Sequence, residues 1–294
     1  MARQFTLSDG RKLDYRVAGK PDATPLLWFH GTPGASLPPP GIEAACEKYG
    51  LSIISFSRPG YGSSTRQKGR LVADTVVDAA ELMKHLGHTR FYTGGWSGGG
   101  PYALTTAIKL PGCLAALVIA GVAPYDGEGL DYLAGQGQDN IDETNAALTG
   151  EEALQAFTKP RRVEMLQASV EELVEGLSSV LPEVDQRALL DGGDLGSYTV
   201  ATFAEALTGS SDGWVDDDLA FTLPWGVNVK DIRVPVFLHH GSLDAAVPFA
   251  HGEWIAAHIP KEYLTKHFEQ GEGHVSIYVG RVDGMISELV ASTS

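Results

Sequence analysis

The most informative segment of this chain is the glycine-rich run Gly94-Gly95-Trp96-Ser97-Gly98-Gly99-Gly100. It follows a strand-like run at residues 90–93 and precedes a helix-like run at residues 101–104. Residues 95–99 match the pattern G-x-S-x-G, and this strand–turn–helix context predicts a sharp, strained turn that exposes the serine. The glycines are explained by steric clash, because a Cβ two residues before or after Ser97 would collide with neighbouring backbone. The turn also places Ser97 at a helix amino terminus, where backbone N–H groups favour developing negative charge.

The apolar runs on either side of this stretch predict a sheet buried on both faces. Runs at residues 25–29, 51–56, 114–119 and 234–238 are nearly continuous rather than alternating, which is typical of parallel strands. Apolar residues recur at helical spacing in residues 74–86, 99–110 and 248–259, which predicts three helices, and Asp74 is the expected N-cap of the first. An Asp9-Gly10 turn predicts a hairpin over residues 5–17. We therefore expect an α/β fold with a mostly parallel, doubly wound sheet and a site beyond the carboxyl ends of its strands.

The middle of the chain interrupts the alternation of strand and helix. Residues 124–230 contain no buried-strand run, and helix-like segments at 151–157, 163–177 and 200–207 lie among glycine- and aspartate-rich turns. Such an insertion predicts a helical cap over the pocket, so that residues 1–123 and 231–294 form the core. The run Asp216-Asp217-Asp218 is expected to be a solvated turn rather than a cation site, since three adjacent aspartates do not form a cage.

A serine nucleophile requires a base and an acid that orients the base. His274 lies in the glycine-rich loop Gly271-Glu272-Gly273-His274-Val275, after the last strand-like stretch, and is the expected base. Asp244 follows the strand at residues 234–238 and is the expected acid. Asp126, which follows an earlier strand, is its alternative. His239 and His240 are interpreted as packed strand residues.

An oxyanion hole is expected beside the serine. The loop His30-Gly31-Thr32-Pro33-Gly34 directly follows the first buried strand, and the backbone N–H groups of Thr32 and Gly98 are the candidate donors. The alternative is a loop that only turns the chain. Trp96, Trp214 and Trp225 are candidate substrate-binding side chains, with ordinary packing as the alternative interpretation for the cap tryptophans.

Taken together, these motifs resemble the α/β-hydrolase family, specifically its cap-bearing serine hydrolase branch. The match includes the elbow at Ser97, Arg58-Pro59-Gly60-Tyr61-Gly62-Ser63, and the loops carrying Asp244 and His274, although Ser57 replaces the aspartate usual in relatives. The resemblance implies a small carboxylic ester or lactone as substrate, hydrolysed through an acyl-enzyme intermediate (carboxylic ester hydrolase, class 3.1.1). The alternatives are a prolyl iminopeptidase-like or carbon–carbon bond hydrolase, and a ligand-binding, receptor-like member with little turnover. A serine nucleophile argues against dehalogenases and epoxide hydrolases.

The composition limits the location and the binding partners that we expect for the protein. Two cysteines, Cys46 and Cys113, lack metal-binding or redox spacing, and the amino terminus lacks a secretion signal, so a reduced, cytoplasmic location is expected. The chain carries 37 acidic against 22 basic residues, a net charge of −15 that disfavours nucleic acid and anionic membranes as partners. We expect a small-molecule substrate, no metal, no cofactor, and a monomer or homodimer.

Overall fold

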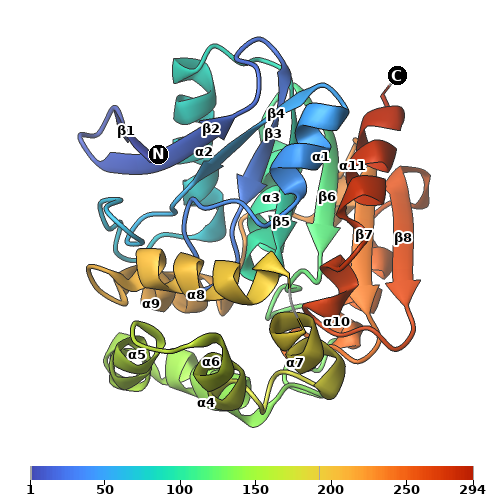
Figure 1. Cartoon of the computed structure of the whole chain (residues 1–294). Coiled ribbons are helices and arrows are strands. Elements are labelled where there is room, and N and C mark those ends of the chain that lie inside the picture. The colour runs from blue at the N-terminus through green and yellow to red at the C-terminus, as the bar shows by residue number, and fades with distance from the viewer. Residues whose placement is uncertain (1, 192, 294) are drawn as a thin grey trace.

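The structure, a computed structural model, describes residues 2–191 and 193–293 and is built on one eight-stranded sheet (Figure 1). The strand order is β1-β2-β4-β3-β5-β6-β7-β8. β1 and β2 form the predicted hairpin, β2 is antiparallel to β4, and every other pairing is parallel. The prediction of a mostly parallel α/β sheet is therefore confirmed. The strands are Arg3–Thr6 (β1), Lys12–Ala18 (β2), Thr24–Phe29 (β3), Leu51–Phe56 (β4), Phe91–Trp96 (β5), Cys113–Ile119 (β6), Val236–Gly241 (β7) and Leu264–Glu269 (β8).

Helices cover both faces of the sheet, which explains why the central strands read as continuous apolar runs. All six residues of β4 and six of the seven of β6 are buried. One face packs into a core with α2, α3 and α10, and the other packs with α1 and α11. These helices are Ile42–Lys48 (α1), Val72–His85 (α2), Gly100–Lys109 (α3), Phe249–His258 (α10) and Val282–Ala291 (α11).

The prediction that Asp74 is the N-cap of α2 is wrong. The helix begins at Val72 with Leu71 as its N-cap, two residues before the predicted start. Asp74 is the third helical residue, and its carboxylate accepts a hydrogen bond from the Leu71 N–H at 2.7 Å. The aspartate thus satisfies an amide of the cap residue instead of forming the cap.

Between β6 and β7, the described residues form six helices that make a cap beyond the carboxyl ends of the strands (Figure 1). The predicted helix over residues 163–177 is split, because α5 runs through Pro160 to Met165 and a capping box between Ser169 and Glu172 starts α6. Three further helices, α4, α7 and α9, occupy segments that sequence analysis assigned to turns. The cap helices are Gln138–Thr149 (α4), Glu151–Met165 (α5), Val170–Gly176 (α6), Glu183–Leu190 (α7), Asp194–Leu207 (α8) and Asp212–Phe221 (α9).

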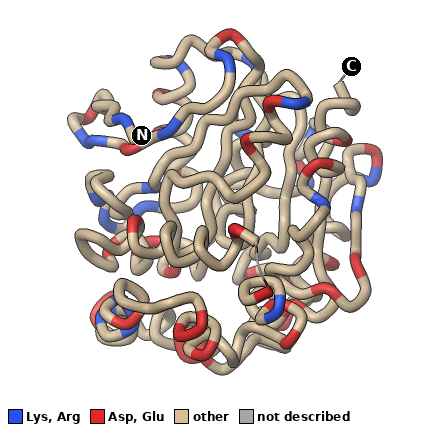
Figure 2. Tube along the Cα trace, in the orientation of Figure 1, with Lys and Arg blue, Asp and Glu red and all other residues tan. Residues whose placement is uncertain are grey.

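Many Asp and Glu positions lie along the chain of the cap (Figure 2). No helix within the described residues is long and apolar enough to cross a membrane.

Candidate active site

Ser97 occupies the sharp turn between β5 and α3. Its φ is +57°, a left-handed conformation that serine rarely adopts. A Cβ on Gly95 would lie 2.3 Å from the Gly99 carbonyl oxygen, and a Cβ on Gly99 would lie 2.2 Å from the Phe29 carbonyl oxygen. The glycines are therefore required by backbone contacts, as the sequence pattern predicted, and the turn presents Ser97 at the carboxyl end of β5.

His274 and Asp244 meet beside this turn, although 30 residues separate them in the sequence. The His274 Nδ1 atom lies 2.8 Å from Asp244 Oδ2. Asp244 Oδ1 accepts hydrogen bonds from the N–H groups of Ala246 and Val247, at 2.9 and 2.7 Å. The carboxylate is thereby oriented towards the imidazole, and a proton on Nδ1 leaves Nε2 as the basic nitrogen. Asp126, the alternative acid, lines a separate surface hollow.

The surroundings of His274 favour its protonated form. Burial of the imidazole lowers the pKa, but the charge and hydrogen bond of Asp244 and the charge of Asp185 outweigh that effect. The pKa of His274 therefore lies above the ordinary value for histidine. A base with this property accepts a proton from a hydroxyl more readily than an unperturbed imidazole does.

Ser97 and His274 line one cavity of about 250 Å³ between the sheet and the cap. Thr32 and Trp96 line it from the core, and Trp214 lines it from α9. The Trp96 indole donates a hydrogen bond to the His274 carbonyl oxygen at 3.1 Å, so it also supports the histidine loop. Much of the remaining wall is apolar and comes from the cap, including Leu177, Val180, Leu181, Phe203 and Phe221.

Trp225 is not among the described residues that line this cavity. It follows α9, where the chain returns to the core, and its ring packs in the same apolar cluster as Val229 and Ile232. Its side chain is buried there and forms part of the wall of the hollow that contains Asp126. The structure thus brings two of the three candidate tryptophans to the cavity and places the third elsewhere.

The two candidate oxyanion donors lie side by side next to the serine. A Cβ on Gly31 would lie 3.6 Å from Ser97 Cβ, so the loop after β3 runs along the elbow. A Cβ on Gly98 would lie 2.4 Å from Thr32 Oγ1. The Thr32 side chain therefore lies directly against the backbone of Gly98, and the assignment of the two N–H groups as oxyanion donors stays a prediction.

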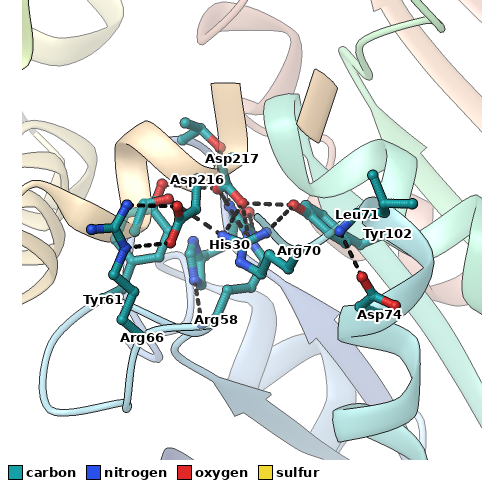
Figure 3. A network of polar contacts seen from close by, with 12 residues as sticks. His30, Arg58, Tyr61, Arg66, Arg70, Leu71, Asp74, Tyr102, Asp216 and Asp217 are labelled. Atoms are coloured by element: carbon teal, nitrogen blue, oxygen red, sulfur yellow. Dashed lines mark hydrogen bonds and ion pairs between the residues drawn. The ribbon is translucent and has the colours of Figure 1, made fainter. Parts of the chain in front are cut away.

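A buried ion-pair network behind this loop was not predicted (Figure 3). Asp217 of α9 lies at its centre, and its Oδ2 accepts hydrogen bonds from the Thr32 hydroxyl at 2.8 Å and from Arg58 Nη2 at 2.5 Å. Its Oδ1 accepts from Arg70 Nη2 and from the Tyr102 hydroxyl, both at 2.6 Å. Burial raises the pKa of Asp217, but the two guanidinium groups outweigh it and hold the pKa well below the ordinary range.

The expectation of a solvated turn at residues 216–218 is therefore wrong. These residues belong to α9, where Asp217 is fully buried and Asp216 is paired with Arg66 Nη2 at 2.8 Å. Arg58 also donates a hydrogen bond to the Gly31 carbonyl oxygen at 2.9 Å, which ties the network to the candidate oxyanion loop. Arg58 belongs to a recognised motif, but its carboxylate partner lies 159 residues away and carries no local signal.

Two further acids, Glu143 of α4 and Asp218 of α9, form part of the cavity wall. They are hydrogen-bonded to each other, and the Trp214 indole donates to Glu143 Oε1. Burial raises the pKa of both carboxyl groups. The two carboxyl groups also interact with each other, so they titrate as a pair rather than independently. Asp218 Oδ2 is buried without a hydrogen-bond partner among the described residues.

Comparison with known proteins identifies the family to which this fold belongs. The family model for the alpha/beta hydrolase fold matches residues 24–280, and the chain belongs to this family. An uncharacterized hydrolase, YcgS, of Bacillus subtilis is 35% identical over 35% of each chain, and a probable proline iminopeptidase of Streptomyces coelicolor is 29% identical over 40% of this chain and 38% of the relative. The matched stretch thus spans little more than a third of these relatives.

Solved structures share the fold over the whole chain. The enol-lactonase of Burkholderia xenovorans LB400 has a TM-score of 0.68 at 15% identity and 98% coverage of both chains. The esterase RhEst1 of Rhodococcus sp. ECU1013 has a TM-score of 0.66 at 19% identity, covering 100% of this chain and 99% of that one. At these identities the likeness is one of fold.

Proposed function

We propose that this α/β-hydrolase cleaves a small carboxylic ester or lactone, with Ser97 as nucleophile, His274 as general base and Asp244 as the acid that orients it. One observation carries the proposal: the 2.8 Å contact between His274 Nδ1 and Asp244 Oδ2 in the wall of the cavity where Ser97 is held at a φ of +57°. An orienting carboxylate, a basic imidazole and a strained serine at one cavity are the parts of a nucleophilic triad.

The reaction follows from these positions. His274 Nε2 accepts the Ser97 hydroxyl proton as the serine oxygen attacks the carbonyl carbon, and the negative charge on the carbonyl oxygen is bound by the N–H groups of Thr32 and Gly98. Each such donor contributes about 3 kcal/mol to transition-state stabilisation. His274 then gives its proton to the leaving alkoxide. Water, activated by the same imidazole, releases the acid and restores Ser97.

The character of the cavity favours a small and largely apolar acyl or alkyl group. Its volume of about 250 Å³ and its leucine, valine and phenylalanine lining suit such a ligand. An esterase and an enol-lactonase share the fold, which supports this chemistry by analogy.

Labelling with a fluorophosphonate tests the nucleophile without a known substrate. We expect one adduct by intact mass on the wild type and on Ser63→Ala, an exposed serine used as a control, and none on Ser97→Ala. A well-folded wild type that forms no adduct, or a Ser97→Ala variant that keeps it, would overturn the proposal. Failure of the wild type would favour a ligand-binding role for the same cavity.

The Glu143–Asp218 pair favours a second candidate, an iminopeptidase-like activity. A buried negative charge in the cavity wall can bind a protonated amine or imine nitrogen, and a relative named as a probable proline iminopeptidase matches part of the chain. Glu143→Gln would then abolish hydrolysis of a prolyl arylamide but not of a neutral aryl ester, with exposed Glu152→Gln as control. Equal effects on both substrates, or no prolyl activity in the wild type, would exclude this candidate.

A further inference from the structure

The loop that carries His274 is held by a carboxylate from the cap. Asp185 of α7 accepts hydrogen bonds from three successive backbone N–H groups, those of His274 at 2.7 Å, Val275 at 3.0 Å and Ser276 at 2.8 Å. The preceding N–H, that of Gly273, donates to Ser276 Oγ at 2.8 Å. Side chains rather than backbone carbonyls therefore satisfy four consecutive amides of this loop.

Asp185 and the histidine loop are in close contact. Asp185 is fully buried, and a Cβ on Gly273 would lie 2.3 Å from its Oδ2. On the other side of the loop, a Cβ on Gly241 would lie 2.4 Å from the Glu272 carbonyl oxygen. The loop is thus held between the end of β7 and the cap helix α7.

Apolar packing places the carboxylate. Leu189, one turn further along α7, belongs to the same buried cluster as Val275 and Ile277. If α7 moved away from the core, this cluster would open, three amides would lose their acceptor, and a buried carboxylate would lose its donors. Burial raises the pKa of Asp185, while the three N–H donors and the charge of His274 act against that rise. Hydrogen bonds to an ionised carboxylate are the stronger kind.

We infer that Asp185 is a positioning residue that couples the docking of cap helix α7 to the placement of the His274 imidazole at Ser97. The inference rests on the proposed function, because it concerns the base of that reaction. The titratable groups that act on His274 are Asp244, from the loop after β7, Asp185 itself, and His240 of β7, whose Nε2 lies 3.5 Å from Asp244 Oδ2. Within the loop, Glu272 is paired with Arg281 Nη2 at 2.7 Å and is already neutralised.

Asp185→Asn tests the inference, because it keeps the side-chain size, removes the charge and turns an N–H donor towards the loop amides. We expect fluorophosphonate labelling of Ser97 to slow at least about tenfold. The pH midpoint of the labelling rate should also fall, since a negative charge near the imidazolium has been removed. Glu183→Gln, on the exposed side of the same helix, is the matched control and should change neither quantity.

Hydrogen exchange of the amides of residues 274–276 gives a readout that does not depend on activity. These amides should exchange at least about tenfold faster in Asp185→Asn than in the wild type and in Glu183→Gln. Unchanged exchange, or slower labelling with an unmoved pH midpoint, would overturn the positioning role. A wild type that cannot be labelled would instead overturn the proposed function, and the exchange experiment would still decide this inference.

Discussion

The Thr32 hydroxyl donates a hydrogen bond to Asp217 Oδ2 over 2.8 Å, which joins the loop after β3 to the cap helix α9. At the other end of the cavity, Asp185 of α7 holds the histidine loop in the same way. Two cap helices, α7 and α9, are thus each fixed to a loop of the proposed active site by a buried carboxylate. The cap is therefore a structural part of the site and not only its cover.

Removing the carboxylate of Asp217 should destabilise the protein. Asp217→Ala leaves Arg58 and Arg70 fully buried without their counter-charge, and breaking such a pair costs about 3–5 kcal/mol. We expect the free energy of unfolding, measured by urea denaturation, to fall by about that amount. Asp212→Ala removes a partly exposed ion pair with Arg66 and should cost less than about 1 kcal/mol. Similar losses in both variants would contradict the central role of Asp217.

Substitution of the proposed nucleophile or base should abolish turnover. Ser97→Ala and His274→Ala are each expected to lower kcat for an activated ester by at least about a thousandfold, because triad members act as a unit. His258→Ala, on α10, serves as the control, since its ring is hydrogen-bonded to the Trp254 carbonyl and stacks on the Trp254 ring of the same helix, and it does not line the cavity of Ser97. Near-normal kcat in either triad variant would refute the assignment.

The pH dependence of the reaction should follow His274. The base must be neutral to accept a proton, so the rate falls as acid protonates it. Although burial lowers the pKa of His274, Asp244 and Asp185 raise it above the ordinary value, and the midpoint of kcat/KM should lie above about 6.5. Asp244→Asn should slow the reaction and move the midpoint to lower pH. A midpoint below 6 in the wild type would contradict the electrostatic argument.

His239 should make the fold sensitive to acid. Burial, with the charges of His267 and Arg281, lowers the pKa of His239 to about 3, so the unfolded chain binds a proton below pH 6.5 that the folded chain does not. Stability should therefore fall with pH between about 6.5 and 3, by about 1.4 kcal/mol per pH unit from this group.

Comparison with His239→Leu isolates this effect. The change in packing is the same at every pH, so only the slope of unfolding free energy against pH reports the titration. Between pH 6 and 4.5 the wild type should lose stability relative to the variant, as measured by denaturation at each pH. Parallel curves would show that His239 is not buried in its neutral form.

Local sequence was sufficient to predict the elements whose conformation depends on residues close by in the chain. The elbow at Ser97 was predictable because its glycines are required by contacts within the turn and the adjacent strand, and the buried strands were predictable because both faces are covered. The loop positions of His274 and Asp244 followed from their order after the last strands. Trp225 shows the limit of prediction from local sequence, since a tryptophan in the connection between cap and core packs equally well in a pocket or in the core.

The sequence alone predicted the order of the strands and of the motifs that carry Ser97, Asp244 and His274, and hence the hydrolase fold and its candidate triad, but not every helix. Only the folded chain brings Asp217 and Asp185 to the two loops of the proposed site and places Glu143 beside Asp218 in the cavity wall. The physical reason is that a carboxylate has no periodicity or spacing that names its partner. Its pKa and its role depend on which N–H or guanidinium group the folded chain brings within about 3 Å of it.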